Sequence, residues 1–187
     1  MNLLQVVVFN LNIRKKIIKK LHNNPYKLIS VITGAGVTAI TDMLSVPGAS
    51  KTVLEVIVPY SKSALEFYKN GPIINHVSVK ESQELALLAY RRGKNYIKNN
   101  EDYIAISCTA AISTIPQRKG EDRAHISWTN GKEIKSVSIY LSKMFRSRIS
   151  QERLISDLII NSIAESFGID LKLDLNLYDD EKIIINR

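Results

Sequence analysis

Residues 26–60 have the sequence YKLISVITGAGVTAITDMLSVPGASKTVLEVIVPY. Lys27 to Thr33 is a short apolar run rich in β-branched residues, and Gly34 and Gly36 end it. Apolar residues then return at helical spacing, and a second apolar run begins at Thr52. The segment therefore predicts a strand, a glycine turn, a helix, a polar turn and a second strand, which is the pattern of an α/β fold.

The glycine turn precedes the first turn of the predicted helix, where backbone N–H groups have no partner within the helix. This geometry favours an anion or a developing oxyanion, so we expect Thr33, Gly34 and Gly36 to contact a ligand. Tight packing is the alternative, because a Gly-x-Gly turn is common in α/β proteins. Neither phosphate-binding fingerprint fits, since no glycine stands three residues after Gly36 and no Gly-Lys-Ser/Thr sequence follows.

The rest of the chain continues the alternation of helices and strands. Asn-Gly at residues 130–131 is typical of a two-residue hairpin turn, and four leucines alternate on one face of residues 170–178. The predicted helices span residues 12–22, 62–69, 78–98 and 150–167, and the further predicted strands span 102–108, 123–129, 133–141, 170–178 and 183–185. These elements predict a three-layer α/β/α sandwich with a mixed sheet.

Length and composition are typical of a globular protein. The chain has 187 residues, of which 45% are hydrophobic and 24% charged, enough for one proper core. We expect a single domain with its core at residues 12–168 and a C-terminal β extension at 169–187. The leucine face of the extension needs burial, so it is expected to extend the sheet or to pair with another subunit in a homo-oligomer.

The scarcity of cysteine and histidine limits the chemistry. One cysteine, Cys108, excludes an internal disulfide framework, and with three histidines it indicates no metal cluster. We also expect no cofactor. The apolar residues 3–9 are too few to span a bilayer, and no small-residue cleavage site follows them. A cytoplasmic protein without membrane contact is therefore expected.

The excess of positive charge points to an anionic partner. The chain carries 26 basic and 18 acidic residues, which gives a net charge of +8. Five basic residues between 14 and 20 share a predicted helix with Ile13, Ile17 and Ile18, as on the solvated face of an amphipathic helix. No zinc-finger or RNP signature accompanies them, so nucleic acid is the less favoured partner. A small phosphorylated, nucleotide-like ligand suits the charge better, because a basic surface steers anions toward a site.

Several short sequences resemble those of one family. Residues 46–50, Val-Pro-Gly-Ala-Ser, are similar to Val-Pro-Gly-Ser-Ser in the CinA C-terminal domain family, and Tyr60-Ser61 resembles the start of its Tyr-Ser-Asn-Glu-Ala-Lys motif. Residues 76–78, His-Val-Ser, are similar to its Ala-Val-Ser helix start, and the order of elements matches over about residues 12–168. The family includes nicotinamide-nucleotide amidases, which convert nicotinamide mononucleotide to nicotinate mononucleotide and ammonia.

The resemblance implies a catalytic site with Ser50 as nucleophile and Tyr60 beside it. The family lysine that partners the serine falls on Leu65, which cannot accept a proton. Lys62 lies about one helical turn away and is the candidate replacement, with Lys51 as a second candidate. Loss of a general base removes roughly 10²- to 10⁴-fold of rate, so we expect amidase activity to be weak or absent.

Two loops of the family are also changed. Its Ser-Cys-Thr-Gly-Gly turn is Thr-Gly-Ala-Gly-Val at residues 33–37, and its Gly-Ile-Ala-Gly-Pro loop is Cys-Thr-Ala-Ala-Ile at residues 108–112. The basic loop that follows suits a phosphate, unless its guanidinium groups pair with Glu121 and Asp122. We expect one cleft at the strand ends, lined by Ser50, Tyr60, Thr33 and Ser107, with Arg118, Lys119 and Arg123 at its rim. Thr109, two residues after Ser107, is expected to bind the ligand as well.

These residues leave three hypotheses. The first is an amidase-like hydrolase acting on a pyridine nucleotide or a related small amide. The second is a catalytically silent relative that binds a nucleotide-like ligand or a partner chain through the same pocket. The third is a nucleic-acid-associated protein that uses its basic surface. His125, just beyond the basic loop, fits a strand residue with a satisfied ring better than a proton-transfer group.

Overall fold

The computed structural model describes residues 3–97 and 101–186, with side chains from residue 12 onward. Six strands form one sheet in the order β2-β1-β3-β4-β5-β6. The strands are β1 (Lys27–Thr33), β2 (Val53–Ile57), β3 (Tyr103–Ala111), β4 (Asp122–Thr129), β5 (Ile134–Leu141) and β6 (Lys182–Asn186). The helices are α1 (Leu3–His22), α2 (Val37–Leu44), α3 (Ala49–Thr52), α4 (Lys62–Lys69), α5 (Val79–Gly93) and α6 (Arg148–Ser166).

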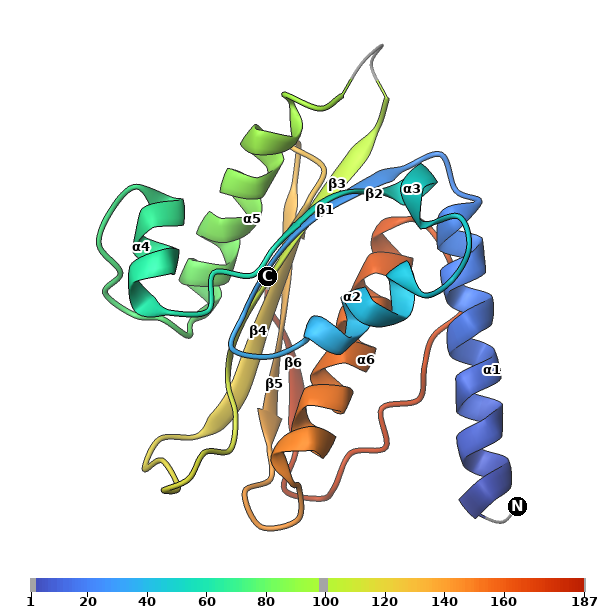
Figure 1. Ribbon diagram of the computed structural model, residues 1–187. Coiled ribbons are helices and arrows are strands. Elements are labelled where there is room, and N and C mark those ends of the chain that lie inside the picture. The colour runs from blue at the N-terminus through green and yellow to red at the C-terminus, as the bar shows by residue number, and fades with distance from the viewer. Residues whose placement is uncertain (1–2, 98–100, 187) are drawn as a thin grey trace.

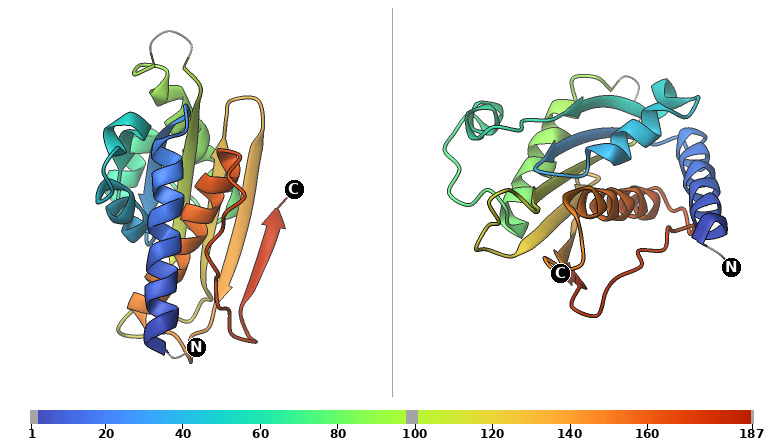
Figure 2. Two further views of the ribbon diagram at one scale, coloured as in Figure 1. Left: turned by 90° about the vertical axis from the view of Figure 1, so that its right-hand side faces the viewer. Right: turned by 60° about the horizontal axis from the view of Figure 1, so that its bottom comes forward.

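The sheet lies between two layers of helices (Figures 1 and 2). α4 and α5 are on one side, and α2, α3 and α6 are on the other, with α1 beside them. β1 pairs in parallel with β2 and β3, whereas β4, β5 and β6 add antiparallel pairs. The predicted three-layer α/β/α sandwich with a mixed sheet is therefore confirmed.

The central strands β1 and β3 are buried along almost their whole length because each has a helical layer on both sides. In β1, every residue after Lys27 is buried. On one face, Ile29 and Val31 pack with Leu65 of α4 and Leu85 of α5. On the other face, a larger cluster joins the sheet to α6 and includes Ile32, Ile106, Ile126, Ile139, Ile155 and Ile159.

Serine side chains mark where three helices begin. The hydroxyls of Ser61, Ser78 and Ser147 accept the N–H groups of the residues three positions later, at the starts of α4, α5 and α6. The predicted cap at Ser78 is confirmed, but α6 begins at Arg148 rather than at Ser150. α1 begins at Leu3, before the predicted residue 12. No helix in residues 3–97 and 101–186 is long and apolar enough to cross a membrane.

The predicted hairpin is confirmed, with a longer turn. Thr129 pairs with Ile134, so residues 130–133 form the turn in place of the expected two. The side-chain oxygen of Asn130 accepts the N–H groups of Lys132 at 2.9 Å and Glu133 at 3.1 Å. The asparagine therefore closes a four-residue turn through its side chain.

The C-terminal segment differs from the prediction in part. Residues 170–178 form no strand, so that part of the predicted β extension is wrong. The segment passes along α6, where the Asn161 amide donates to the Leu173 carbonyl at 2.9 Å and accepts the Leu173 N–H at 2.7 Å. The Asn161 amide thus supplies the two backbone hydrogen bonds that a neighbouring strand would otherwise make with Leu173. The short strand predicted at residues 183–185 is confirmed, because β6 pairs with β5 and extends the sheet.

Replacing Leu173 with alanine should lower the free energy of unfolding by about 2–4 kcal/mol, because the side chain packs on the α6 side of the core. Leu173 is 5% exposed, whereas Leu177 is 39% exposed. Leu177→Ala is the matched control and should change stability by less than about 0.5 kcal/mol. Urea unfolding of both variants checks the prediction, and equal losses would contradict the burial of Leu173.

Candidate functional site

The carboxyl ends of β1, β2 and β3 meet at one edge of the sheet, which is where α/β folds bind ligands. Tyr60 follows β2 at this edge and is 66% exposed. Arg148, at the start of α6, donates to the Tyr60 hydroxyl at 3.1 Å and to the Ser113 carbonyl at 2.7 Å. Tyr60 and Arg148 thus place a phenol and a guanidinium together on the surface beside the strand ends.

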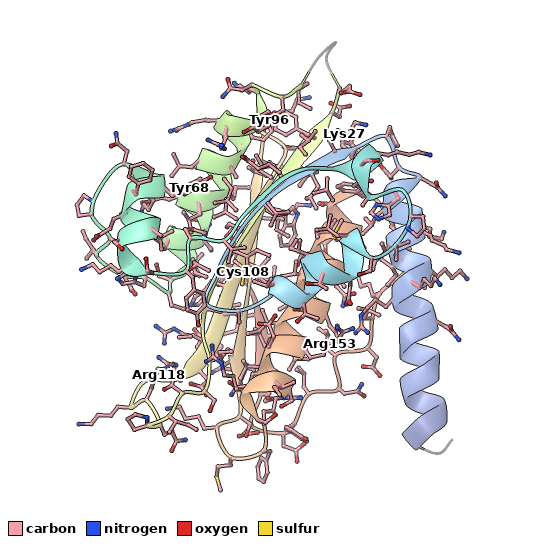
Figure 3. All side chains as sticks on the ribbon, in the orientation of Figure 1. Lys27, Tyr68, Tyr96, Cys108, Arg118 and Arg153 are labelled. Carbon is pink, nitrogen blue, oxygen red and sulfur yellow. The ribbon has the colours of Figure 1, made fainter. Side chains whose placement is uncertain are left out.

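A hydrogen-bonded chain connects this pair to the basic loop. Gln151 accepts the Ser113 N–H at 2.7 Å and donates to the Asp122 carboxylate at 2.9 Å. The other carboxylate oxygen of Asp122 accepts from Arg118 at 2.8 Å. Because Asp122 begins β4 beside the end of β3, Arg118 lies at the same edge of the sheet (Figure 3).

Each arginine of the predicted rim already holds part of the loop. Arg118 is bound to Asp122, as the internal-pairing alternative anticipated. Arg123 donates to the carbonyls of Glu121 at 3.2 Å and Val77 at 3.1 Å. Lys119 is exposed at the loop. These contacts fix the backbone of the loop and gather positive charge at the edge that also carries Arg148.

The glycine turn is a packing turn, and a carboxylate already occupies two of the N–H groups at the start of α2. The Glu152 carboxylate accepts the N–H of Gly36 at 2.6 Å and that of Thr38 at 3.0 Å. A side chain on Gly34 would meet the Ala110 carbonyl oxygen at 1.9 Å, so this glycine is required by close contact with β3. The chain's own carboxylate therefore fills the place where an anion was predicted.

The hydroxyls predicted from β3 face α5 instead of a cleft. Ser107 donates to the Ser82 carbonyl, and Thr109 donates to the Ser78 carbonyl at 3.4 Å. Both residues are fully buried. They hold the start of α5 on the sheet, so in this conformation neither can touch a ligand.

Ser50 lies at the opposite end of the sheet from Tyr60. Its neighbour Lys51 accepts a 2.7 Å hydrogen bond at its carbonyl from the side chain of Lys27, at the start of β1. Figure 3 shows Lys27 and Arg118 at opposite ends of the sheet. β2 has five residues, so its length of about 15 Å separates Ser50 from Tyr60 and Lys62. The predicted convergence of Ser50 with Tyr60 and Thr33 in one cleft is therefore wrong for a single chain.

The physical reason is the direction of the strands. β1 and β2 are parallel, so α2 must carry the chain back to the amino end before β2 starts. The short helix α3, which contains Ser50, therefore precedes the amino end of β2, while Thr33 is the last residue of β1 and Tyr60 follows the carboxyl end of β2.

Of the two candidate bases, Lys51 is next to Ser50 in the chain and is exposed, whereas Lys62 has no access to Ser50. Lys62 is exposed and lies 3.7 Å from Glu66, one turn along α4. Leu65 is 2% exposed and packs with Ile29 and Val31 of β1. The position of the expected lysine is thus part of the apolar core.

His125 is a buried strand residue with a satisfied ring, as predicted. Its Nδ1 lies 2.7 Å from the Ser138 hydroxyl. Burial, together with the nearby Arg123, lowers the pKa of His125 to about 4. The ring is therefore neutral at physiological pH.

We expect His125 to make the fold less stable in acid. The unfolded chain binds a proton at His125 below its ordinary pKa of 6.5, whereas the folded chain does so only near 4. The free energy of unfolding should therefore fall as the pH is lowered from 6.5 to 4. Replacing His125 with glutamine should flatten this dependence in denaturant titrations, and an unchanged slope would contradict it.

The fold and the edge with Tyr60 and Arg148 define a three-layer α/β/α protein with a basic surface at the carboxyl ends of its parallel strands. No protein-family model matches the sequence, and no curated protein matches it. Solved structures are similar in fold. A competence-damaged protein (CinA) superfamily protein from Klebsiella pneumoniae has a TM-score of 0.64 and 10% identity, over 85% of this chain and 98% of that one.

Two further structures agree. The CinA superfamily protein from Escherichia coli has a TM-score of 0.60 and 13% identity, over 84% of this chain and 88% of that one. The competence/damage inducible protein CihA from Agrobacterium tumefaciens has a TM-score of 0.58 and 11% identity, over 85% and 92%. The chain therefore has the fold of CinA superfamily proteins, in line with the resemblance seen in its sequence.

Proposed function

We propose that this CinA-like protein binds a small anionic, nucleotide-like ligand and has little or no amidase activity. The observation that carries the proposal is the burial of Leu65, which α4 packs against β1. This is the position where the resemblance puts the catalytic lysine. A serine hydroxyl needs a positioned base to become a nucleophile. Ser50 has neither Lys62 nor Tyr60 within reach in one chain, as the length of β2 requires.

Binding is supported by the charge at the carboxyl edge. Arg148 is exposed and holds its guanidinium against the Tyr60 hydroxyl, and the exposed Lys119 adds a second positive charge at this end of the sheet. Guanidinium groups suit phosphate because they donate in a planar fork. Nicotinamide mononucleotide is the natural probe, since the resemblance is to enzymes that act on it.

The first experiment incubates the chain with nicotinamide mononucleotide and measures both ammonia release and binding by calorimetry. We expect binding without ammonia above the blank. Arg148→Gln should weaken binding about tenfold, the loss typical of a charged hydrogen bond. Lys132→Gln, in the β4–β5 turn at the other end of the sheet, is the matched control and should leave binding unchanged. Ammonia release that Ser50→Ala abolishes would overturn the proposal in favour of an amidase.

Two further properties belong to the proposal. β2 and β6 each pair on one side only within residues 3–97 and 101–186, so open sheet edges favour a homo-oligomer, which light scattering would detect. The single cysteine, Cys108, is buried and free, as in proteins of the cytoplasm.

Nucleic acid is the competing partner, and a steep salt dependence of DNA binding would favour it.

A further inference from the structure

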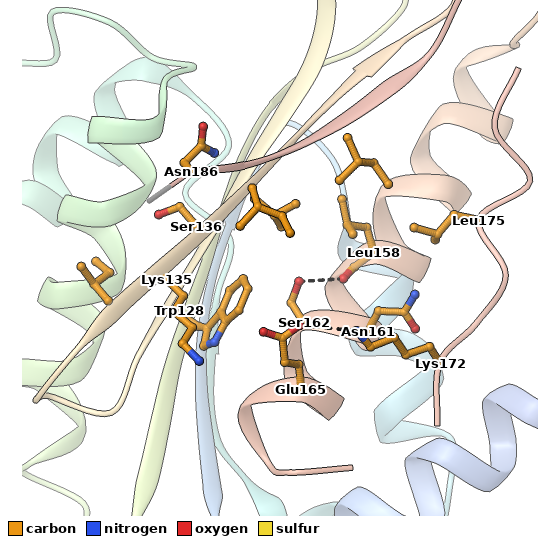
Figure 4. A pocket seen from close by; sticks show the side chains of 14 residues that line it. Trp128, Lys135, Ser136, Leu158, Asn161, Ser162, Glu165, Lys172, Leu175 and Asn186 are labelled. Atoms are coloured by element: carbon orange, nitrogen blue, oxygen red, sulfur yellow. Dashed lines mark hydrogen bonds and ion pairs between the residues drawn. The ribbon is translucent and has the colours of Figure 1, made fainter. Parts of the chain in front are cut away.

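A cavity of about 400 Å³ lies between the antiparallel half of the sheet and the second half of α6 (Figure 4). Trp128 and Val137 line it from the sheet, and Leu158 and Ser162 line it from α6. Leu175, in the segment that passes along α6, adds a further wall. The volume is within the range of small-molecule sites in proteins.

The cavity is distinct from the edge that carries Arg148. Leu158 lies ten residues after Arg148 on α6, which corresponds to about 15 Å along the helix. The lining of the cavity includes β6, which is antiparallel to β5 at the far edge of the sheet from β2. A ligand here would therefore occupy a second, separate site.

The interior of the cavity favours an apolar group, because the side chains of Asn161, Ser162 and Ser136 already have hydrogen-bond partners. Asn161 uses its amide donor and acceptor on the backbone of Leu173. Ser162 donates to the Leu158 carbonyl at 2.9 Å, as the dashed line in Figure 4 marks. Ser136 lies 2.9 Å from the Ser127 hydroxyl and accepts from Gln83 at 3.0 Å. A polar group in the interior would lose its hydration without gaining a strong partner.

The charged side chains that line the cavity are exposed, and two of the three are basic. Lys135 lies 4.0 Å from Glu133, and Lys172 lies 3.6 Å from Glu165. Glu165 lines the cavity with the two lysines, whereas Glu133 does not. Exposed pairs at such distances contribute little, so both ammonium groups remain available to a further carboxylate.

We propose that this cavity binds a small amphipathic carboxylate, with its apolar body against Trp128 and Leu158 and its carboxylate between Lys135 and Lys172. The apolar interior selects the body, and the two lysines of the lining, against the single carboxylate of Glu165, select an anionic end over a cationic one. Aliphatic and aromatic bodies share this chemistry.

Trp128 is the chain's one tryptophan, so its fluorescence reports directly on the cavity. The test titrates the full chain with octanoate, 1-octanol and octylammonium, which share an apolar tail and differ in the charge of the head. We expect a saturable change in Trp128 emission, with octanoate binding at least about fivefold more tightly than octylammonium. An unsaturable change, or equal binding of the two ions, would overturn the proposal.

Variants separate the apolar body from the head group. Ser162→Leu, which fills part of the cavity, should weaken both octanoate and octanol by about tenfold or more. Lys135→Gln combined with Lys172→Gln should weaken octanoate about fivefold and leave octanol within about twofold. Lys132→Gln, in the same hairpin but outside the lining, is the matched control.

The surface variants keep the test decisive if Ser162→Leu fails to fold, which circular dichroism would show. Octanoate affinity that is the same in the double lysine variant and in the wild type would overturn the assigned position of the carboxylate. Failure of this test would leave the Arg148 site untouched, because nicotinamide mononucleotide binding is measured separately.

Discussion

Leu65→Lys is expected to lower the free energy of unfolding by at least about 3 kcal/mol and to bring no amidase activity. The variant places a lysine where the resemblance puts the family's lysine, so sequence alone would present it as a repair. In the structure Leu65 is buried against Ile29, Val31 and Leu85, with no acidic partner among these apolar neighbours. An ammonium group there loses its hydration, and the leucine packing is lost as well.

Denaturant unfolding of wild type, Leu65→Lys and Leu65→Met measures this effect. Methionine has nearly the volume of leucine and should cost less than about 1.5 kcal/mol. An unchanged stability of the lysine variant would contradict the packing of α4 on the sheet. A gain of ammonia release in the folded fraction of that variant would contradict the separation of Ser50 from this position.

Arg146→Ala is expected to destabilise the fold by about 3–5 kcal/mol, because it leaves a buried carboxylate without its partner. The Glu181 side chain is 0% exposed and receives hydrogen bonds from Arg146 at 2.5 and 2.7 Å. It also accepts the N–H groups of Ser142 and Tyr178. These contacts tie the end of β5 to the start of β6, so the variant should also loosen the C-terminal strand.

The pH dependence of this effect identifies the carboxylate. Burial raises the pKa of Glu181, but the hydrogen bonds from Arg146 and from the two backbone N–H groups together lower the pKa by more than burial raises it. The pKa of Glu181 therefore lies below the ordinary value of 4.5. In the wild type, the stability that comes from Glu181 is present above that value and is lost as the pH falls through the lowered pKa.

Without Arg146, protonation of Glu181 relieves the buried charge. The difference in stability between wild type and Arg146→Ala should therefore shrink as the pH is lowered from about 7 toward the acid range. Lys62→Ala is the control, because it removes an exposed pair with Glu66 and should cost less than about 1 kcal/mol. A pH-independent difference would contradict the assignment to Glu181.

The fold could be predicted from local patterns because its elements have strong local signals. The continuous apolar run of β1 indicates a strand covered on both faces, and Asn130 and Gly131 indicate the β4–β5 hairpin. The tail was different. The alternation of its leucines correctly indicates that Leu173 is buried. The backbone of Leu173, however, forms its hydrogen bonds with the side-chain amide of Asn161 and not with a neighbouring strand. Periodicity reports which side chains are buried, and it does not report what satisfies the backbone.

The candidate site was less predictable, because its residues come together only in three dimensions. Tyr60 was predicted at the edge, but Arg148 was not, since it lies 88 residues away and no motif marks it. The same holds for Glu152, whose carboxylate fills the N-terminus of α2 from a distance of 116 residues in the chain. In the sequence, Glu152 is a carboxylate near the start of the last predicted helix, and its spacing gives no indication that it contacts the glycine turn.

Periodicity, turn residues and residue identity were enough to predict the α/β class and most of its elements, and to see that Leu65 stands where the resemblance puts a lysine. The tertiary structure was needed to show that Ser50 lies at the amino end of β2, away from Tyr60. It also decided that Ser107 and Thr109 support α5 and that Glu152 occupies the glycine turn. Strand direction and long-range side-chain contacts set these positions, and neither leaves a local pattern in the chain.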